Sequence, residues 1–243
     1  MNERKSVGSG YFSNVYVRPA GRGFEAIKVF KANRSLRELE TVRTMQRSGA
    51  LQHPNIIGMR PVRPGATVLV MDFADQRDLF HQVTTNTVPE STVARWIGDA
   101  LAGLAHLHDR GWAHCDVKME NILIMRDGRA VLCDFGYAVQ DRQDRGRVSA
   151  GTDAYAPPER GDCVSVFAVD VWQIGVTALS ARLVADLPFR MSDLVTTAAS
   201  TEQFWKTLRD TFHRSGWVWP WPRSRRACDF VDRTLCYDAR DRP

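Results

Sequence analysis

Lysine is scarce in this chain, and long apolar runs, repeats and flexible linkers are missing. Only five of the 33 basic residues are lysines, namely Lys5, Lys28, Lys31, Lys118 and Lys206. No apolar run approaches the ~18–20 residues that a membrane span needs. The first five residues are polar, so no signal peptide is indicated. The lack of a long apolar run and of a signal peptide predicts an intracellular protein that does not span a membrane.

Cysteine and charge exclude two further classes. The five cysteines are an odd number without CxxC spacing, which predicts reduced thiols rather than a disulfide framework. The net charge is +5 and the pI about 9.1, but the basic residues are scattered. Such a charge gives weak attraction to anionic surfaces and predicts no specific nucleic-acid partner. Hydrophobic content of 44% and charged content of 25% are ordinary for a globular chain with a substantial core.

The first third of the chain has the pattern of strands around one helix. Residues 5–30 predict three strands, with turns at Gly8–Gly10 and Arg18–Gly21. Residues 35–47 have helical spacing. Two further strands are predicted, and they cover residues 56–62 and 67–73.

The second part of the chain has helical periodicity. Residues 92–110 predict a long helix with one buried face, and residues 169–184 are apolar nearly all round, which indicates a central helix. We therefore expect an α+β fold with a small antiparallel β-rich lobe that carries one helix (about residues 1–73). A hinge (about 72–78) would lead to a larger, mainly helical lobe (about 79–243).

The most informative segment is His114–Asn121, which is followed by Asp134-Phe135-Gly136. It contains an acid, a cation and two oxygen ligands in the order Asp116, Lys118, Asn121 and Asp134. Hard cations prefer carboxylate oxygen and bridge phosphates. Taken singly, each residue is more commonly a surface polar group or a turn former. In this order they indicate transfer of a phosphoryl group from ATP to a hydroxyl.

Two weaker features precede this segment. Gly8 and Gly10 frame a loop whose backbone could close over phosphates, although a GxG in a hairpin is more often an ordinary turn. Lys28 lies inside the apolar run Ala26–Phe30, where lysine is usually an edge or snorkelling residue. Together, in this order, the two features favour a nucleotide-phosphate site.

These motifs resemble the signature set of eukaryotic-type protein kinases over about residues 6–243. Lys118, two residues after Asp116, and Thr152 are similar to the serine/threonine branch. The resemblance implies a bilobal fold that binds ATP and Mg²⁺. It also implies transfer of the γ-phosphate to Ser or Thr hydroxyls of protein substrates.

The resemblance also assigns roles to single residues. Asp116 would accept or orient the hydroxyl proton, and Lys118 would neutralise the γ-phosphate. Asn121 and Asp134 would bind the metal, and Lys28 would align the α- and β-phosphates. The nucleotide would also contact Val7, Gly8, Ser9, Gly10, Tyr11, Phe12, Ser13, Asn14, Val15, Ala26, Met71, Asp72, Ala74, Asp78 and Leu123. Of these, Ser13 stands where the family usually has a third glycine.

Lys28 requires a carboxylate partner to stay aligned, and the predicted helix offers Glu38 and Glu40. Family helices place apolar residues three, four and seven positions after the pairing Glu. Glu38 matches this spacing better than Glu40 does. We therefore predict the pair Lys28–Glu38, with the other carboxylate as a solvated surface group.

Two scaffold contacts follow from the resemblance as well. Glu159 would form a buried ion pair with Arg242, and Asp170 would hold the backbone of the loop around Asp116. Breaking one partner of such a buried pair would leave an uncompensated charge.

Cys115 departs from the family, because most regulated kinases have an Arg there that gathers a phosphate on the activation segment. One interpretation is little dependence on phosphorylation at a site such as Ser149. The other is that Cys115 is simply a small buried residue and that another arginine takes over. The candidates are Arg142, Arg145 and Arg147.

Several alternatives stay open. A pseudokinase scaffold and a small-molecule kinase of related fold are the rivals of an active protein kinase.

Asp78 and Glu120 match acidic positions of cyclic-AMP-dependent protein kinase and its relatives that hold an Arg upstream of the target residue. Alternatively, Asp78 contacts only ribose and Glu120 is solvated. We expect a monomer. The Trp-rich run 217–222 would cover the surface of the larger lobe. The compact chain would suit a viral or other streamlined genome.

Overall fold

The computed structural model describes most of the chain. The described residues are 5–9, 13–21, 23–31, 36–60, 62–63, 65–141, 151–159, 165–183, 203, 206, 207, 210, 225–236 and 238–243. Some residues named above lie outside this set, namely Gly10, Tyr11, Phe12, Arg142, Arg145, Arg147, Ser149 and the run 217–222.

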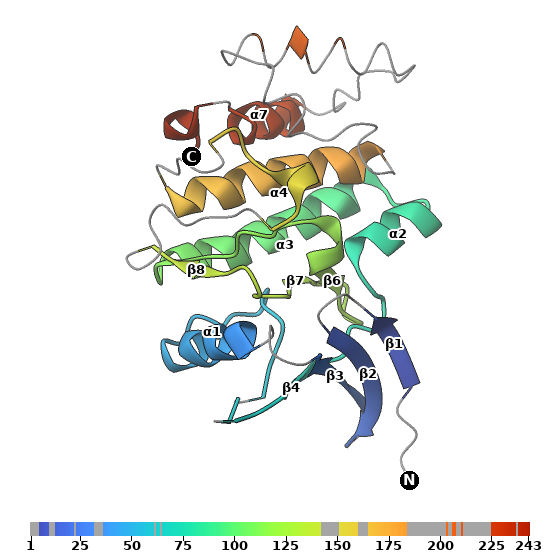
Figure 1. The fold of residues 1–243 in the computed structure, drawn as a ribbon. Coiled ribbons are helices and arrows are strands. Elements are labelled where there is room, and N and C mark those ends of the chain that lie inside the picture. Colours follow the sequence, from blue (N-terminus) through green and yellow to red (C-terminus); the bar gives the residue numbers. More distant parts are fainter. Residues whose placement is uncertain are drawn as a thin grey trace.

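Four antiparallel strands form a sheet in the order β1-β2-β3-β4 (Figure 1). They are β1 (Lys5–Ser9), β2 (Ser13–Ala20), β3 (Gly23–Phe30) and β4 (Val68–Asp72). Lys28 lies in the middle of this sheet, opposite Val15 of β2 and Leu69 of β4. The predicted strands over residues 5–30 and 67–73 are therefore confirmed.

The β2–β3 hairpin turns later than the sequence predicts. Arg18, Pro19 and Ala20 are not turn residues, because they pair with Glu25, Phe24 and Gly23 across the two strands. The turn starts at Gly21, whose φ of 57° is a left-handed conformation that glycine adopts without a Cβ clash. An ion pair between Arg18 and Glu25 (3.0 Å) bridges the two strands close to this turn.

The prediction of a strand near residues 56–62 is wrong. Ile56 forms a single parallel bridge with Leu132, and Met59 forms a single antiparallel bridge with Met71. Because the segment changes its partner within three residues, no continuous ladder of backbone pairs develops along it.

One helix accompanies the sheet. Helix α1 (Leu36–Arg47) buries Leu39, Val42 and Met45 on one side, which is the spacing that the sequence predicts. Figure 1 shows α1 beside the sheet in the lower part of the molecule, with the helices α2, α3 and α4 above them. The small β-rich part with one helix is thus confirmed.

The rest of the chain is mainly helical. Its elements are α2 (Leu79–Thr85), α3 (Glu90–His108), β5 (Trp112–Ala113), η1 (Met119–Asn121), β6 (Ile122–Ile124), β7 (Ala130–Leu132), β8 (Val139–Gln140), η2 (Asp153–Tyr155), α4 (Val166–Leu183), α7 (Arg225–Thr234) and η3 (Ala239–Asp241). Short strand pairs β5–β8 and β6–β7 carry the segments around residues 114–121 and 134–136 between the helices and the sheet. No helix among the described residues is both long and apolar enough to cross a membrane.

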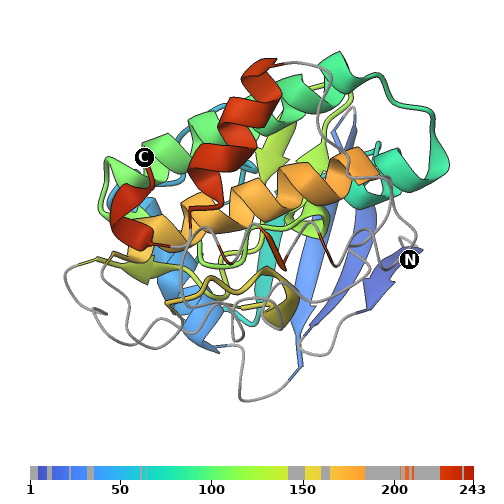
Figure 2. The same ribbon diagram turned by 90° about the horizontal axis from the view of Figure 1, so that it is seen from above.

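Helix α4 is the centre of the helical part, as predicted. It contacts α3, α7 and β5 and runs alongside α3 in both views (Figures 1 and 2). Trp172 and Ile174 are completely buried in it. Gly175 lets α7 approach, since a Cβ at this position would lie 2.4 Å from Thr234 Oγ1. The α+β fold class that the sequence predicts is therefore confirmed.

Candidate active site

Lys28 joins the sheet, α1 and the segment that follows β7. Its Nζ lies 2.7 Å from Glu38 Oε1 and 3.2 Å from Asp134 Oδ2. The side chains of Lys28 and Glu38 are buried. Glu40, in contrast, is exposed and lies 3.8 Å from Arg43. Helix α1 thus turns Glu38, and not Glu40, toward the lysine.

Burial and mutual attraction shift the pKa values of these three groups. Burial acts to lower the pKa of Lys28, but Asp134 and Glu38 outweigh burial and raise it. Burial acts to raise the pKa of Asp134, but Lys28 outweighs burial and lowers it. Burial and the charge of Asp134 raise the pKa of Glu38 to about 7, although Lys28 opposes both. Glu38 is therefore the member of the cluster that titrates near neutral pH.

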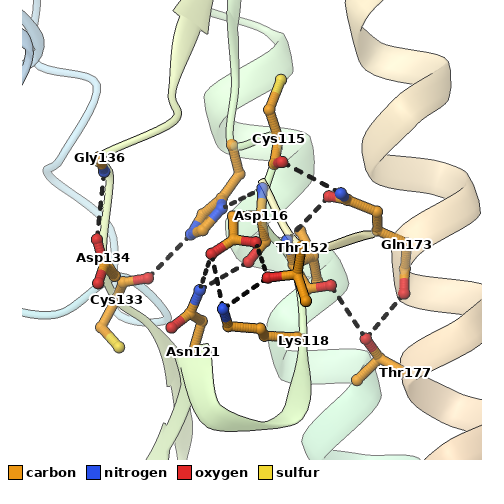
Figure 3. Close-up of polar contacts among 12 residues, drawn as sticks. Cys115, Asp116, Lys118, Asn121, Cys133, Asp134, Gly136, Thr152, Gln173 and Thr177 are labelled. Atoms are coloured by element: carbon orange, nitrogen blue, oxygen red, sulfur yellow. Dashed lines mark hydrogen bonds and ion pairs between the residues drawn. The ribbon is translucent and has the colours of Figure 1, made fainter. Parts of the chain in front are cut away.

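The carboxylate of Asp116 is the centre of a second cluster (Figure 3). Its Oδ2 lies 3.0 Å from Lys118 Nζ and accepts a hydrogen bond of 2.9 Å from Asn121 Nδ2. Its Oδ1 accepts a hydrogen bond of 2.7 Å from the Thr152 hydroxyl. Lys118 Nζ in turn donates to Thr152 Oγ1 at 2.8 Å. The site therefore links Asp116, Lys118 and Asn121 to a residue that lies 31 positions after Asn121.

Thr152 was missed as a site residue by sequence reasoning, which used it only as a mark of the serine/threonine branch. Its neighbour Gly151 explains how the segment 151–159 comes so close. Gly151 N donates to Cys115 O at 3.0 Å, and a Cβ on Gly151 would lie only 2.5 Å from Asp116 Oδ1. A residue with a side chain would therefore push this segment away from Asp116.

The backbone of this site is strained at two positions. Cys115 has φ of 61° and Asp134 has φ of 63°, a left-handed conformation that costs a residue with a Cβ about 1–3 kcal/mol unless its surroundings hold it. Asp170 of α4 accepts hydrogen bonds from the backbone N–H groups of His114 (2.8 Å) and Cys115 (2.7 Å). The predicted contact of Asp170 with this loop is confirmed, and it holds the strained residue in place.

The oxygen atoms near Asp134 suit a hard divalent cation. Asn121 uses its Nδ2 to bind Asp116 O (2.7 Å) and Oδ2, which leaves its amide oxygen as an acceptor. Asn121 O accepts from Cys133 N at 3.0 Å, so this backbone bond joins one predicted ligand, Asn121, to the residue before the other, Asp134. The side chain of Asp134 is 42% exposed and hence accessible. A carboxylate and an amide oxygen, supplemented by phosphate oxygens, match the preference of Mg²⁺.

The other residues predicted to contact a nucleotide lie on strands β3 and β4 of the sheet, and on β6 and the residue before α2. Ala26 of β3 is buried and pairs with Met71 of β4. Leu123 of β6 forms a bridge with Asp78, whose Oδ1 caps α2 by accepting from His81 N at 2.7 Å. The strand residues of the glycine-rich loop within the described set are Val7, Gly8 and Ser9 of β1 and Ser13, Asn14 and Val15 of β2.

The segment predicted as the hinge, about residues 72–78, connects β4 to α2. Asp72 is exposed and donates its N–H to Gly58 O at 2.8 Å, and Ala74 is buried. Ala74 O accepts from Arg77 N at 3.3 Å, which starts the turn into α2. The chain thus passes from β4 to α2 through one short connection.

The predicted bridge between Glu159 and Arg242 is present. Arg242 Nη2 donates to Glu159 Oε2 at 2.8 Å, and Nη1 forms a second bond to the same carboxylate. The Arg242 side chain is completely buried and lies over the Trp172 ring, 4.9 Å from its centroid. The bridge fastens the segment after Thr152 to the helical part.

The first cluster joins the sheet and α1 to the segment after β7, and the second cluster lies in the helical part. The family described as "Protein kinase domain" matches residues 1–243. The chain therefore belongs to the protein kinase family, and its α+β fold is the bilobal kinase fold.

The individual relatives are protein kinases, and one of them is named as a serine/threonine-protein kinase. CBL-interacting protein kinase 16 of Oryza sativa subsp. japonica is 32% identical over 198 residues, which are 76% of this chain and 43% of that protein. Aurora/IPL1-related protein kinase 2 of Caenorhabditis elegans is 29% identical over 247 residues, 98% of this chain and 77% of that protein. CBL-interacting serine/threonine-protein kinase 15 of Arabidopsis thaliana is 31% identical over 204 residues, which are 79% of this chain and 48% of that protein. The chain thus spans less than half the length of the CBL-interacting relatives.

Proposed function

We propose that the chain is an active serine/threonine protein kinase that transfers the γ-phosphate of ATP, with Mg²⁺, to Ser or Thr hydroxyls of proteins. The observation that carries this proposal is the simultaneous presence of two assembled clusters. Lys28 is paired with both Glu38 and Asp134, while Asp116 is held by Lys118, Asn121 and Thr152. Membership of the family and the serine/threonine kinases among the relatives support the same activity.

Each cluster has a separate task in this proposal. Lys28 holds the α- and β-phosphates, and Glu38 keeps it in position. The hydroxyl oxygen of the substrate forms a bond to the γ-phosphorus, the bond to the bridging oxygen of ADP breaks, and the hydroxyl proton passes to the Asp116 carboxylate. Lys118 neutralises charge on the transferred phosphoryl group.

Asn121 and Asp134 are the residues that would hold the metal. A divalent cation at their oxygens supplies charge neutralisation on the phosphates. The Lys28–Asp134 contact keeps this carboxylate ionised, since it lowers the pKa of Asp134. The chain's own contribution is therefore a charged, pre-positioned ligand.

A pseudokinase is the rival that one experiment excludes. We would measure transfer of γ-labelled phosphate from ATP to a generic basic protein by the wild-type chain and by Asp116→Asn, which preserves the shape of the side chain. The kinase proposal expects incorporation by the wild type and a loss of about 100-fold or more in the variant. Absence of transfer by the wild type at saturating Mg²⁺ and ATP would favour a pseudokinase scaffold. Label on a small molecule alone would favour a small-molecule kinase of related fold.

Cys115 supports a kinase that does not strictly need phosphorylation of its activation segment. The residue is completely buried, and its backbone N–H is bound by Asp170. A thiol at this position offers no guanidinium to a phosphate. Gly151 and Thr152 bind the segment to the site through Cys115 O and Asp116.

Substrate preference is a finer part of the proposal. Asp78 and Glu120 would together bind an Arg a few residues before the target hydroxyl, because two carboxylates on one guanidinium bind better than one exposed pair. Asp78 Oδ1 already caps α2, so only part of its carboxylate is available. A positional-scanning peptide library tests this preference. An unchanged Arg preference in Glu120→Ala, or a preference for Pro after the target, would contradict it.

The remaining parts of the proposal concern organisation and place. We place the N-lobe at about residues 1–73, the hinge at about 72–78 and the C-lobe at about 79–243 of one domain. An intracellular location suits Cys115, Cys133 and Cys236, which form no disulfide among the described residues. Light scattering of the purified chain tests the expected monomer.

A further inference from the structure

Helix α4 buries several polar side chains, although most of its sequence is apolar. Asp170, Gln173 and Thr177 follow each other at spacings of three and four residues, so they lie on one face of the helix. All three are completely buried. A buried polar side chain is unfavourable unless its hydrogen bonds are made. Here all three bind the backbone of residues 114–117.

Gln173 makes the most unusual contacts of the three (Figure 3). Its Oε1 accepts a hydrogen bond of 2.9 Å from Val117 N, and its Nε2 donates one of 3.1 Å to Cys115 O. Cys115 O belongs to the peptide group before Asp116, and Val117 N belongs to the peptide group after it. One carboxamide therefore holds both peptide planes that meet at the Cα of Asp116.

The other two side chains hold the neighbouring groups. Asp170 binds the backbone N–H groups of His114 and Cys115, at 2.8 and 2.7 Å. Thr177 bonds mainly to the backbone of its own helix, at Gln173 O (2.8 Å), and more weakly to Val117 O (3.3 Å). Only Gln173 therefore binds on both sides of Asp116.

The loop needs such a clamp because of its own strain. The left-handed conformation of Cys115 (φ 61°) persists only where the surroundings over-determine it. If the peptide plane between Cys115 and Asp116 rotated, the Asp116 carboxylate would swing away from Lys118 and Thr152. Proton transfer and in-line attack depend on placement of that carboxylate to well within 1 Å.

We propose that Gln173 is a positioning residue for phosphoryl transfer, whose carboxamide sets the direction of the Asp116 carboxylate by clamping the two peptide groups around it. The inference rests on the proposed kinase activity. Gln173 is completely buried beneath the loop, so we expect its loss to act on the chemical step and to leave nucleotide binding intact.

The test replaces Gln173 by Met, which preserves length and removes both hydrogen bonds. We expect kcat for a peptide substrate to fall by about 10- to 100-fold, while KM for ATP changes by less than about threefold. Gln173→Asn, one methylene shorter and able to keep at most one of the two bonds, should show an intermediate kcat, and it serves alone if the Met variant does not fold. Leu235→Ala is the matched control, because Leu235 is completely buried and packs against α4 at Gly175.

The outcomes separate a positioning role from a merely structural one. A kcat within about twofold of wild type in folded Gln173→Asn or Gln173→Met would overturn the proposal. So would a joint change of kcat, KM and melting temperature that Leu235→Ala reproduces. If the wild type transfers no phosphate, the proposed function fails, and the clamp is judged by amide hydrogen exchange. Faster exchange at Val117 N–H in Gln173→Asn than in wild type then supports the clamp, and unchanged exchange refutes it.

Discussion

At the scale of single residues, Lys28 depends on two carboxylates that come from different parts of the chain. Glu38 belongs to α1 and Asp134 to the segment after β7, and both lie within 3.2 Å of its Nζ. A lysine in a sheet interior tolerates burial only because both charges compensate its own. The same two contacts make Lys28 and Glu38 suitable for a direct mutational comparison.

Lys28→Ala should reduce phosphate transfer by about 100-fold or more, since it removes charge stabilisation of the phosphates. Glu38→Gln should also reduce it, although less, because Lys28 keeps Asp134. Glu40→Gln is the matched control and should behave as wild type, because Glu40 is exposed and paired only with Arg43. Steady-state kinetics decide this, with circular dichroism as the test of folding. Equal losses in the Glu38 and Glu40 variants would contradict the assignment.

Glu38 should also give the enzyme a pH dependence near neutrality. Its pKa in the folded chain is about 7, raised by burial and by Asp134 from the model-peptide value of 4.5. The folded chain therefore binds this proton more tightly than the unfolded chain, so the contribution of Glu38 to stability is greatest on the acidic side and is lost as the pH rises toward about 7. Activity should show the opposite trend, because the ionised carboxylate is needed to pair with Lys28.

We expect kcat/KM for ATP to fall as the pH is lowered from about 8 to about 6. The same step should be absent from the profile of Glu38→Gln, whose side chain cannot ionise. The measurement is initial rate against pH at fixed ionic strength, with thermal unfolding of the wild type over the same range. A step of equal size in both proteins would show that another group titrates.

At the scale of elements, a buried bridge joins the segment after Thr152 to the end of the chain. Arg242 binds Glu159 with two guanidinium nitrogens and also donates to Ala168 O (2.9 Å) and Cys236 O (2.8 Å). Four bonds from one buried side chain therefore tie the start of α4, the end of α7 and the segment 151–159 together. This arrangement predicts a large effect on stability.

Glu159→Ala should lower the free energy of unfolding by about 3–5 kcal/mol, because it leaves the Arg242 guanidinium buried without its counter-charge. Arg126→Ala is the control, since this arginine forms an exposed pair with Asp75 (2.7 Å), and it should leave the stability unchanged within error. Urea denaturation followed by circular dichroism measures both. A loss in Glu159→Ala no larger than that in Arg126→Ala would show that the bridge contributes little.

At the scale of the whole molecule, the two clusters are present together, one at the sheet and one in the helical part. Lys28–Glu38, Lys28–Asp134 and Asp116–Thr152 contacts are all present together. Because the Thr152 hydroxyl joins the segment 151–159 to Asp116, and because Cys115 offers no guanidinium to a phosphate, we expect phosphorylation to add little further order to this segment.

Phosphatase treatment of the purified kinase should therefore lower its activity by less than about tenfold. Specific activity and the phosphate content by mass spectrometry are measured before and after treatment. Restoration of a larger loss by autophosphorylation would contradict the prediction, and it would indicate that another basic residue takes the place that Cys115 leaves open.

The order of the motifs was enough to predict much of this protein. The spacing Asp116-x-Lys118-x-x-Asn121 and the following Asp134 identify the chemistry locally, because residues close in sequence stay close in a short loop. Helical periodicity similarly predicted α1, α3 and α4 to within a few residues, since burial of one face has a local signature. The predicted strand at 56–62 failed because strand pairing depends on distant partners, here Leu132 and Met71.

The family, the fold class and the set of charged residues can be predicted from the sequence, because they depend on composition, periodicity and local spacing. Which distant groups meet depends instead on how the elements pack. The ion pair of Lys28 with Asp134 depends on how the segment after β7 lies against the sheet. The contact of Thr152 with Asp116 depends on the missing side chain of Gly151, and the clamp by Gln173 depends on how α4 packs under the loop. Each of these contacts spans ten or more residues, so its free energy depends on packing that no local pattern encodes.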